Sequence, residues 1–175
     1  MTRSSGLLRR TGAAGLDYLV IVAWVGVVTV IGAVARTLAP GVMDGLFASP
    51  IGGELAGFMS LTMPVALYFI VLEASPSGGT WGKRRLGLRV TTVDGERIGL
   101  RRSAARTILK LLPWELSHFA IWQLSAGPSV PPPVPYIALI VVWVLVGASL
   151  ASVLVSRRKR AIYDFAAGTV VTFPG

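Results

Sequence analysis

Apolar residues fill three stretches of the chain that are long enough to cross a bilayer as helices. They run from Tyr18 to Ala35, from Leu55 to Leu72 and from Val134 to Val155, and none contains a charged residue. A helix needs about 20 apolar residues, or about 17 at the least, to cross the hydrocarbon core. Large apolar side chains lie on differing faces of each predicted helix, which is typical of helices embedded in lipid. The pattern therefore predicts transmembrane helices.

A fourth, shorter candidate runs from Leu111 to Ala126 and contains Pro113, Glu115 and His118. Hydropathy alone leaves it out, but the charge distribution favours it. With a cytoplasmic N-terminus, four spans place every lysine and arginine except Arg36 on the cytoplasmic side, as the positive-inside rule requires. Three spans would instead place the basic tail after Val155 outside. A re-entrant or interfacial segment at 111–126 is the alternative.

The predicted fold is therefore an all-α transmembrane helical bundle with four spans, the third of them short and polar. Both termini are expected in the cytoplasm, and the whole chain, residues 1–175, forms one membrane domain. The spans are predicted at about 13–36, 53–73, 109–126 and 135–155, with a cytoplasmic insert at 75–108. Gly53 and Gly57 form a G-x-x-x-G pair in the second span, which predicts close helix packing.

The insert is polar and basic. Asp94 and Gly95 favour a two-residue turn, so Leu86–Val93 and Glu96–Leu100 are predicted to pair as a small β-hairpin. Residues 101–110 are predicted to form a basic amphipathic helix lying along anionic lipid headgroups. Ordinary anchoring by cytoplasmic positive charge explains this pattern, and a specific lipid or nucleic-acid site is the alternative interpretation. Three residues of this helix are expected to contact the headgroups: Arg102, Arg106 and Lys110.

Composition narrows the function. The chain is 53% apolar and only 14% charged, whereas soluble domains are about 25% charged. It contains no cysteine, which excludes thiol catalysis and cysteine-based metal sites. The net charge of +9 fits an anionic membrane surface. Nucleic acid is not an expected partner, because Trp81 is the only aromatic residue of the insert. No nucleophile and base can be assigned, so we do not expect an enzyme.

Charged residues near the spans need an explanation, because each one costs free energy in the bilayer. With four spans, all of them fall at the cytoplasmic end or in the inner half of a helix, where opposite charges can meet. Asp164 can reach Arg10 if the tail folds back under the bundle. The cluster then either fixes the helix ends or holds a site where a cation or proton competes for the carboxylates. The residues are Arg10, Asp17, Glu73, Lys110, Glu115, His118 and Asp164.

Glu115 and His118 are three residues apart and project from one face of the third predicted span. A lone imidazole beside a carboxylate inside a membrane fits a proton relay. An interhelical hydrogen bond that holds the short span in place fits equally well. A di-metal bundle would need a second such pair. We therefore expect no metal and no other cofactor.

Several segments are similar to the RDD family of bacterial membrane proteins, which is named for one arginine and two aspartates. The matching segments cover nearly the whole chain: Arg9–Asp17, Gly79–Arg84, Gly87–Val90, Asp94–Gly95 and Tyr163–Val171. The resemblance assigns the name-giving positions to Arg10, with Arg9 as the alternative, and to Asp17 and Asp164. It implies a multi-pass protein of the bacterial inner membrane, with cation/proton antiport as the associated activity. Many members have three predicted spans.

Two functions compete at this point. The first is transport by a homo-oligomer that exchanges Na⁺ or a similar monovalent cation for protons, because a four-span protomer is too small to enclose much of a pathway. The second is a non-catalytic membrane module that binds or assembles proteins or lipids through the basic insert. The expected partners are the bilayer, its anionic lipids, and a monovalent cation or proton. The predicted ion site comprises Arg10, Asp17, Asp164, Glu73, Glu115 and His118.

Overall fold

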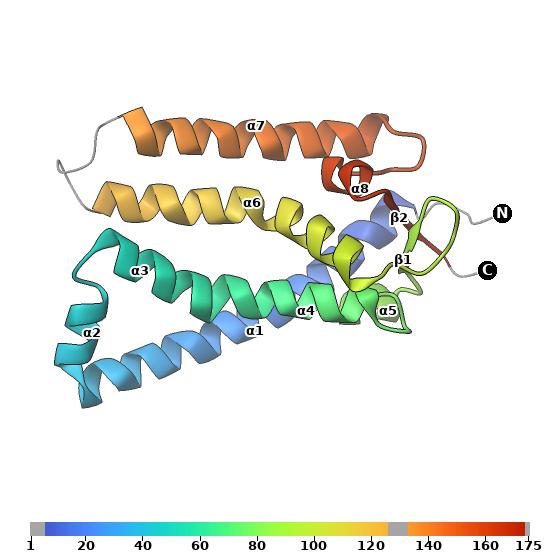
Figure 1. Cartoon of the computed structure of the whole chain (residues 1–175). Coiled ribbons are helices and arrows are strands. Elements are labelled where there is room, and N and C mark those ends of the chain that lie inside the picture. Colours follow the sequence, from blue (N-terminus) through green and yellow to red (C-terminus); the bar gives the residue numbers. More distant parts are fainter. Residues whose placement is uncertain (1–5, 126–132, 174–175) are drawn as a thin grey trace.

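The computed structural model describes residues 6–125 and 133–173, and most of these are helical. Four long helical segments lie side by side and give the molecule an elongated shape (Figure 1). The short helix α2 (Pro40–Leu46) connects the first two segments at one end. The long segments are α1 (Leu7–Leu38), the continuous run of α3 (Pro50–Gly57), η1 (Phe58–Thr62) and α4 (Met63–Ala74), then α6 (Leu100–Ser125) and α7 (Pro133–Val155).

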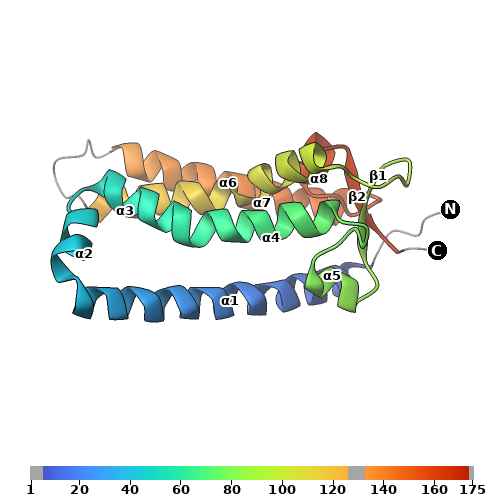
Figure 2. The same ribbon diagram turned by 60° about the horizontal axis from the view of Figure 1, so that its bottom comes forward.

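The opposite end of the bundle carries the remaining elements, and we call it the sheet end. Figures 1 and 2 show these elements gathered there, away from α2. They cover the ends of α1, α4, α6 and α7 that lie farthest from α2. The elements are α5 (Trp81–Arg85), β1 (Arg89–Thr92), α8 (Ile162–Ala166) and β2 (Thr169–Thr172).

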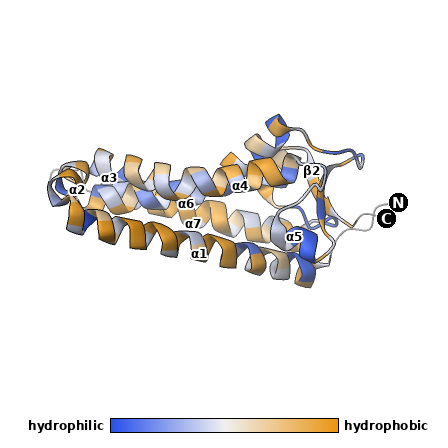
Figure 3. Cartoon of the chain, turned by 90° about the horizontal axis from the view of Figure 1, so that it is seen from below, coloured by the Kyte–Doolittle hydropathy of each residue, from blue (hydrophilic) through white to orange (hydrophobic). Residues whose placement is uncertain are grey.

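Three of the long segments have the length and hydropathy of membrane spans: Leu7–Leu38, Pro50–Ala74 and Pro133–Val155. These segments consist mostly of apolar residues (Figure 3), and many of their large apolar side chains are exposed. In α1 only Ala13 and Asp17 are buried, both near its N-terminal end. A surface this apolar is stable in lipid and not in water. The three spans predicted from uncharged stretches are therefore present as helices of spanning length.

Helix α6 is the fourth long segment, and it runs without a break from the insert into the bundle. The basic helix predicted at 101–110 and the span predicted at 109–126 are thus parts of one helix that continues through Pro113. The half of α6 beyond Lys110 packs beside α7 and α3 (Figure 1). Its polar residues keep it outside the hydropathy range of the other three, so a fourth span remains a prediction.

Close packing holds α3 against α6. A Cβ atom added at Gly53 would lie only 2.5 Å from the indole ring of Trp122, whereas one at Gly57 would lie 3.8 Å from the same ring. Glycine at position 53 therefore lets the two helices approach, as the G-x-x-x-G pattern predicted. Phe47 stacks on the other side of this contact, with its ring centroid 5.8 Å from that of Trp122.

The predicted β-hairpin forms only in part, as a single antiparallel bridge between Thr91 and Arg97. The chain does turn at Asp94–Gly95, where the amide of Thr92 donates to the carbonyl of Glu96. Strand β1, however, pairs antiparallel with β2 from the other end of the chain, with Val90 opposite Val171. All four residues of β2 are buried. The four buried, β-branched residues of β2 give β1 more apolar contact than the segment 96–100, in which only Ile98 is buried.

Candidate functional site

Seven charged side chains from five helices meet at the sheet end of the bundle. We call this group the charge cluster. Helix α1 provides two of them, α4 and α5 one each, α6 two and α8 one. Four are cations and three are carboxylates, so the group carries one excess positive charge when all are ionised. The members are Arg10, Asp17, Glu73, Lys83, Arg106, Lys110 and Asp164.

Arg106 lies at the centre of the charge cluster and is only 3% exposed. Its Nη1 donates to Glu73 Oε2 at 2.6 Å, and its Nε donates to Asp164 Oδ1 at 2.8 Å. Helix α8 holds Asp164 in place, because this carboxylate also accepts from the amide of Ala161 and the hydroxyl of Thr169. Arg106 therefore ties α6 to both α4 and α8 through charge-assisted hydrogen bonds.

Asp17 joins α1 to the insert. Its Oδ1 accepts from the hydroxyl of Tyr68 at 2.8 Å and from the amide of Gly82 at 2.8 Å, and its Oδ2 accepts from the hydroxyl of Thr80 at 2.5 Å. The Nζ atom of Lys83 lies 3.8 Å from the same carboxylate. Asp17 is buried but fully hydrogen-bonded, so its first role is to fix α5 against α1.

Glu73 faces three cations. Besides Arg106, the Nζ of Lys83 donates to Glu73 Oε1 at 3.0 Å, and the Nζ of Lys110 lies 3.7 Å from that oxygen. The last distance is too long for a hydrogen bond. Lys110 Nζ instead lies 3.1 Å from the ring centroid of Phe69. Lys110 is thus the least well satisfied cation around this carboxylate.

Two cationic nitrogen atoms are buried without a hydrogen-bond partner among the described residues. One is Lys110 Nζ and the other is Arg10 Nη2. The second lies 3.9 Å from Asp164 Oδ2, again beyond hydrogen-bond distance. Buried donors are nearly always paired in proteins. Both atoms therefore have capacity for a ligand.

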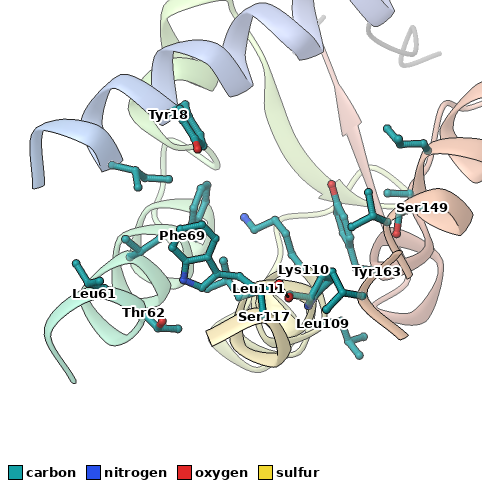
Figure 4. Close-up of a pocket in the computed structure, with 18 of the residues that line it drawn as sticks. Tyr18, Leu61, Thr62, Phe69, Leu109, Lys110, Leu111, Ser117, Ser149 and Tyr163 are labelled. Carbon is teal, nitrogen blue, oxygen red and sulfur yellow. Dashed lines mark hydrogen bonds between the residues drawn. The ribbon is translucent and has the colours of Figure 1, made fainter. Parts of the chain in front are cut away.

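Two adjoining cavities lie at this end of the bundle, and both are lined by Lys110. One of about 590 Å³ is lined by six members of the charge cluster (Arg10, Asp17, Lys83, Arg106, Lys110 and Asp164), by Tyr163 and by apolar residues of α1 and α7. The other, of about 510 Å³, continues along α4, α6 and α7 as far as Thr62. Figure 4 shows the ammonium of Lys110 pointing into the space between Phe69 and Tyr163. Burial raises the pKa of Tyr163, so its hydroxyl stays protonated.

A second polar group lies farther along α6. Glu115 Oε1 accepts a hydrogen bond from the hydroxyl of Thr62, at the end of the π-helix η1. His118 Nδ1 lies 3.6 Å from the same oxygen, and its ring meets that of Trp114 edge-on at 4.7 Å. π-Helical turns often occur at functional sites. The structure thus brings the predicted pair together and adds Thr62 as a partner.

The predicted site divides into two places. Arg10, Asp17, Glu73 and Asp164 lie in the charge cluster. Glu115 and His118 form the separate group with Thr62 and do not contact the charge cluster through any ion pair between described residues. The charges are therefore shared between two sites along the bundle.

Only part of the basic helix has the exposure that its predicted surface role requires. Arg102 is exposed, so its contact with headgroups remains a prediction. Arg106 cannot lie along the headgroups, because its guanidinium is buried between Glu73 and Asp164. Lys110 also turns inward, with its ammonium buried in the bundle. Buried carboxylates from α4 and α8 draw these two cations inside, which the charge pattern of α6 alone does not reveal.

Sequence reasoning missed four contributors to the charge cluster. Lys83 was counted only as a cytoplasmic charge, and Tyr68, Thr80 and Gly82 were assigned no role. A signal was available in the Gly79–Arg84 motif of the resemblance, because it places a hydroxyl, a glycine and a lysine within four residues. The partner of that motif, Asp17, is more than 60 residues away along the chain.

Similarity to known proteins lies at the level of the family. The model of the RDD family matches residues 4–168, which include all seven residues of the charge cluster. No curated protein and no solved structure is significantly similar to the chain. A match over nearly the whole length, together with three apolar helices of spanning length, identifies a membrane protein. The chain belongs to the RDD family.

Proposed function

We propose that this protein exchanges a monovalent cation for protons across the membrane, and that Lys110 is the group that takes up and releases the proton. The supporting observation is the position of Lys110 Nζ, which is buried, lacks a hydrogen-bond partner among the described residues and lies 3.7 Å from Glu73. Lysine is a group whose protonation responds readily to burial. Arginine stays charged, so Arg10 and Arg106 do not fill this role.

Charge balance connects the proton to the cation. When Lys110 is protonated, the charge cluster has four cations and three carboxylates. When it releases its proton, three of each remain, and the space beside Glu73 Oε1 can accept a small cation. Proton and cation thus compete for one position, which is the minimum requirement for exchange. The aromatic ring of Phe69, already 3.1 Å from Lys110 Nζ, would face either occupant.

The polar group of Thr62, Glu115 and His118 supplies a second position for the proton. The cavity of about 510 Å³ is lined by both Lys110 and Thr62, which donates to Glu115. Protons can pass between Glu115 and His118 on one side and Lys110 on the other if this cavity admits water.

The proposal includes four spans, both termini in the cytoplasm of a bacterial cell, and a homo-oligomer that encloses the cavity. The tight packing of α6 beside α7 supports the fourth span.

The test uses purified protein in vesicles loaded with a pH-sensitive dye. Pulses of Na⁺, K⁺ or Li⁺ should move protons in the wild type and not in empty vesicles. Lys110→Met should abolish the movement, and so should Lys110→Arg, because a guanidinium keeps its proton. Arg36→Gln is a matched control, since this exposed residue is remote from the charge cluster. Wild-type rates in Lys110→Met would contradict the proposal.

A non-catalytic membrane module is the second candidate, and the exposed basic residues of the insert favour it. Arg101 and Arg102 both lie on the surface of α6 at the sheet end. Reversing their charge should abolish crosslinking to a partner in native membranes if they form a docking surface. Arg106 is unsuitable for this experiment because it is buried. Unchanged crosslinking in the reversed variant would exclude this surface.

A further inference from the structure

We propose that an anionic membrane phospholipid binds between α1 and α7, with its phosphate between Arg10 Nη2 and Lys110 Nζ and one acyl chain in the adjoining cavity. This inference concerns binding and does not rest on the proposed exchange. It follows from three properties of the same region: unsatisfied donors, excess positive charge, and apolar walls that continue away from them.

The donors come first. Arg10 Nη2 and Lys110 Nζ are both buried, both lack a hydrogen-bond partner in residues 6–125 and 133–173, and both line the cavity of about 590 Å³. Leaving a buried charged donor unsatisfied is costly. Arginine and lysine nitrogen atoms both form charge-assisted bonds with phosphate. The hydroxyl of Tyr163 lines the same cavity and remains a neutral donor, since burial raises its pKa.

The charge balance points to an anion at this position. Three carboxylates face four cations in the charge cluster, and the two unsatisfied nitrogen atoms are those held least closely by carboxylates, at 3.9 Å and 3.7 Å. Every other cation of the group has a hydrogen bond of 3.0 Å or less to a carboxylate. One bound phosphate monoanion would neutralise the excess.

The apolar walls of the cavity favour an amphiphilic ligand over a free anion. From Lys110, the cavity of about 510 Å³ continues between Ile21 and Val25 of α1 and Val146 and Val153 of α7. These helices belong to the apolar segments of spanning length, so the opening between them faces lipid in the membrane. Figure 4 shows Lys110 extending from α6 into this space, with Tyr18 of α1 on one side and Ser149 of α7 on the other. The phosphate of a phospholipid matches the cationic end of this space, and its acyl chain matches the apolar walls.

The experiment is native mass spectrometry of the full chain in detergent, titrated with phosphatidylglycerol or with phosphatidylcholine of the same acyl chains. The wild type should bind one phosphatidylglycerol molecule at least about tenfold more tightly than phosphatidylcholine. Lys110→Met and Arg10→Met should each weaken phosphatidylglycerol binding about tenfold or more, as expected for loss of a charge-assisted bond. Arg36→Met removes an exposed arginine of α1 and should bind like the wild type.

Further arms identify the part of the lipid that is bound. Val153→Phe narrows the apolar cavity without changing any charge and should also weaken phosphatidylglycerol binding. Inorganic phosphate should compete poorly; efficient competition would mean a soluble anion and overturn the lipid assignment. Equal binding of both lipids, or a second protein copy in place of lipid, would overturn it as well. A wild-type protein that exchanges cations for protons but binds both lipids equally would refute this inference alone. A wild-type protein that prefers phosphatidylglycerol but shows no exchange would refute only the proposed exchange.

Discussion

The side chains of Arg106 and Asp164, 58 residues apart in the sequence, form a buried ion pair with an N–O distance of 2.8 Å. The pair joins α6 to α8, and α8 leads directly into β2. The same guanidinium holds Glu73 of α4. One arginine therefore connects α4 and α6 to the sheet end. Arg10, to which the resemblance assigns the name-giving arginine, stays 3.9 Å from Asp164.

Replacing Arg106 should strongly destabilise the protein. Arg106→Met leaves the carboxylates of Glu73 and Asp164 buried without their closest cation, and breaking a buried ion pair in this way costs about 3–5 kcal/mol. Arg102→Met, one turn earlier on the same helix, removes an exposed arginine and should cost little. Thermal unfolding in detergent measures both. Similar stability of the two variants would contradict the central position of Arg106.

Alanine at position 82 should separate α5 from α1. Its Cβ would lie 2.2 Å from the carbonyl oxygen of Ala13 and 2.9 Å from Asp17 Oδ1, so the backbone must move and the hydrogen bonds to Asp17 must lengthen. We expect Gly82→Ala to cost about 1–3 kcal/mol, as overpacking does. Gly99→Ala is the matched control, because nothing lies within 4 Å of its Cβ. Thermal unfolding compares the two, and equal stability would argue against this contact.

The sequence predicted the parts of this fold that depend on local pattern. Uncharged stretches of spanning length located α1, the α3–α4 segment and α7, because hydropathy is a property of each segment alone. The pairing of β1 was not predictable in this way, since its partner β2 lies at the far end of the chain. A tight turn at Asp94–Gly95 specifies a reversal but not which strand fills the neighbouring position.

The charge cluster shows the same limit. Asp17, Glu73 and Asp164 stood out because carboxylates near apolar spans are costly. The sequence does not identify which of its many lysines and arginines pair with these carboxylates. Arg106 seemed to belong to a basic surface, because helical periodicity records which residues share a face and not what covers that face. The buried partners come from α4 and α8, so only the tertiary structure identifies Arg106 as an internal residue.

The packing of α3 on α6 should tolerate alanine at one glycine and not at the other. Gly53→Ala places a Cβ 2.5 Å from the ring of Trp122, whereas Gly57→Ala places one at an ordinary contact distance of 3.8 Å. The first substitution should destabilise the protein by about 1–3 kcal/mol and the second by much less. In a Trp122→Ala background the difference should shrink, since the clash is gone. A persistent difference in thermal stability would require another cause.

Labelling of introduced cysteines tests whether α6 crosses the membrane. The chain has no cysteine of its own, so single replacements at Thr37, Ser125 and Arg157 give a clean background. With four spans and a cytoplasmic N-terminus, an impermeant maleimide added to intact cells should label positions 37 and 125 but not position 157. If α6 is re-entrant, positions 37 and 157 should be labelled and position 125 should not.

We expect the result for a membrane-crossing α6, with positions 37 and 125 labelled, because of how its side chains are placed. Two residues of α6 beyond Lys110 face the bundle: Glu115 accepts a hydrogen bond from Thr62 of the neighbouring segment, and Ala120 is completely buried. Ile121 and Leu124, by contrast, are exposed. A helix that pairs its carboxylate with a neighbouring helix and shows apolar side chains outward can remain in lipid despite low mean hydropathy. Labelling at position 157 in intact cells would contradict that orientation and place the basic tail outside.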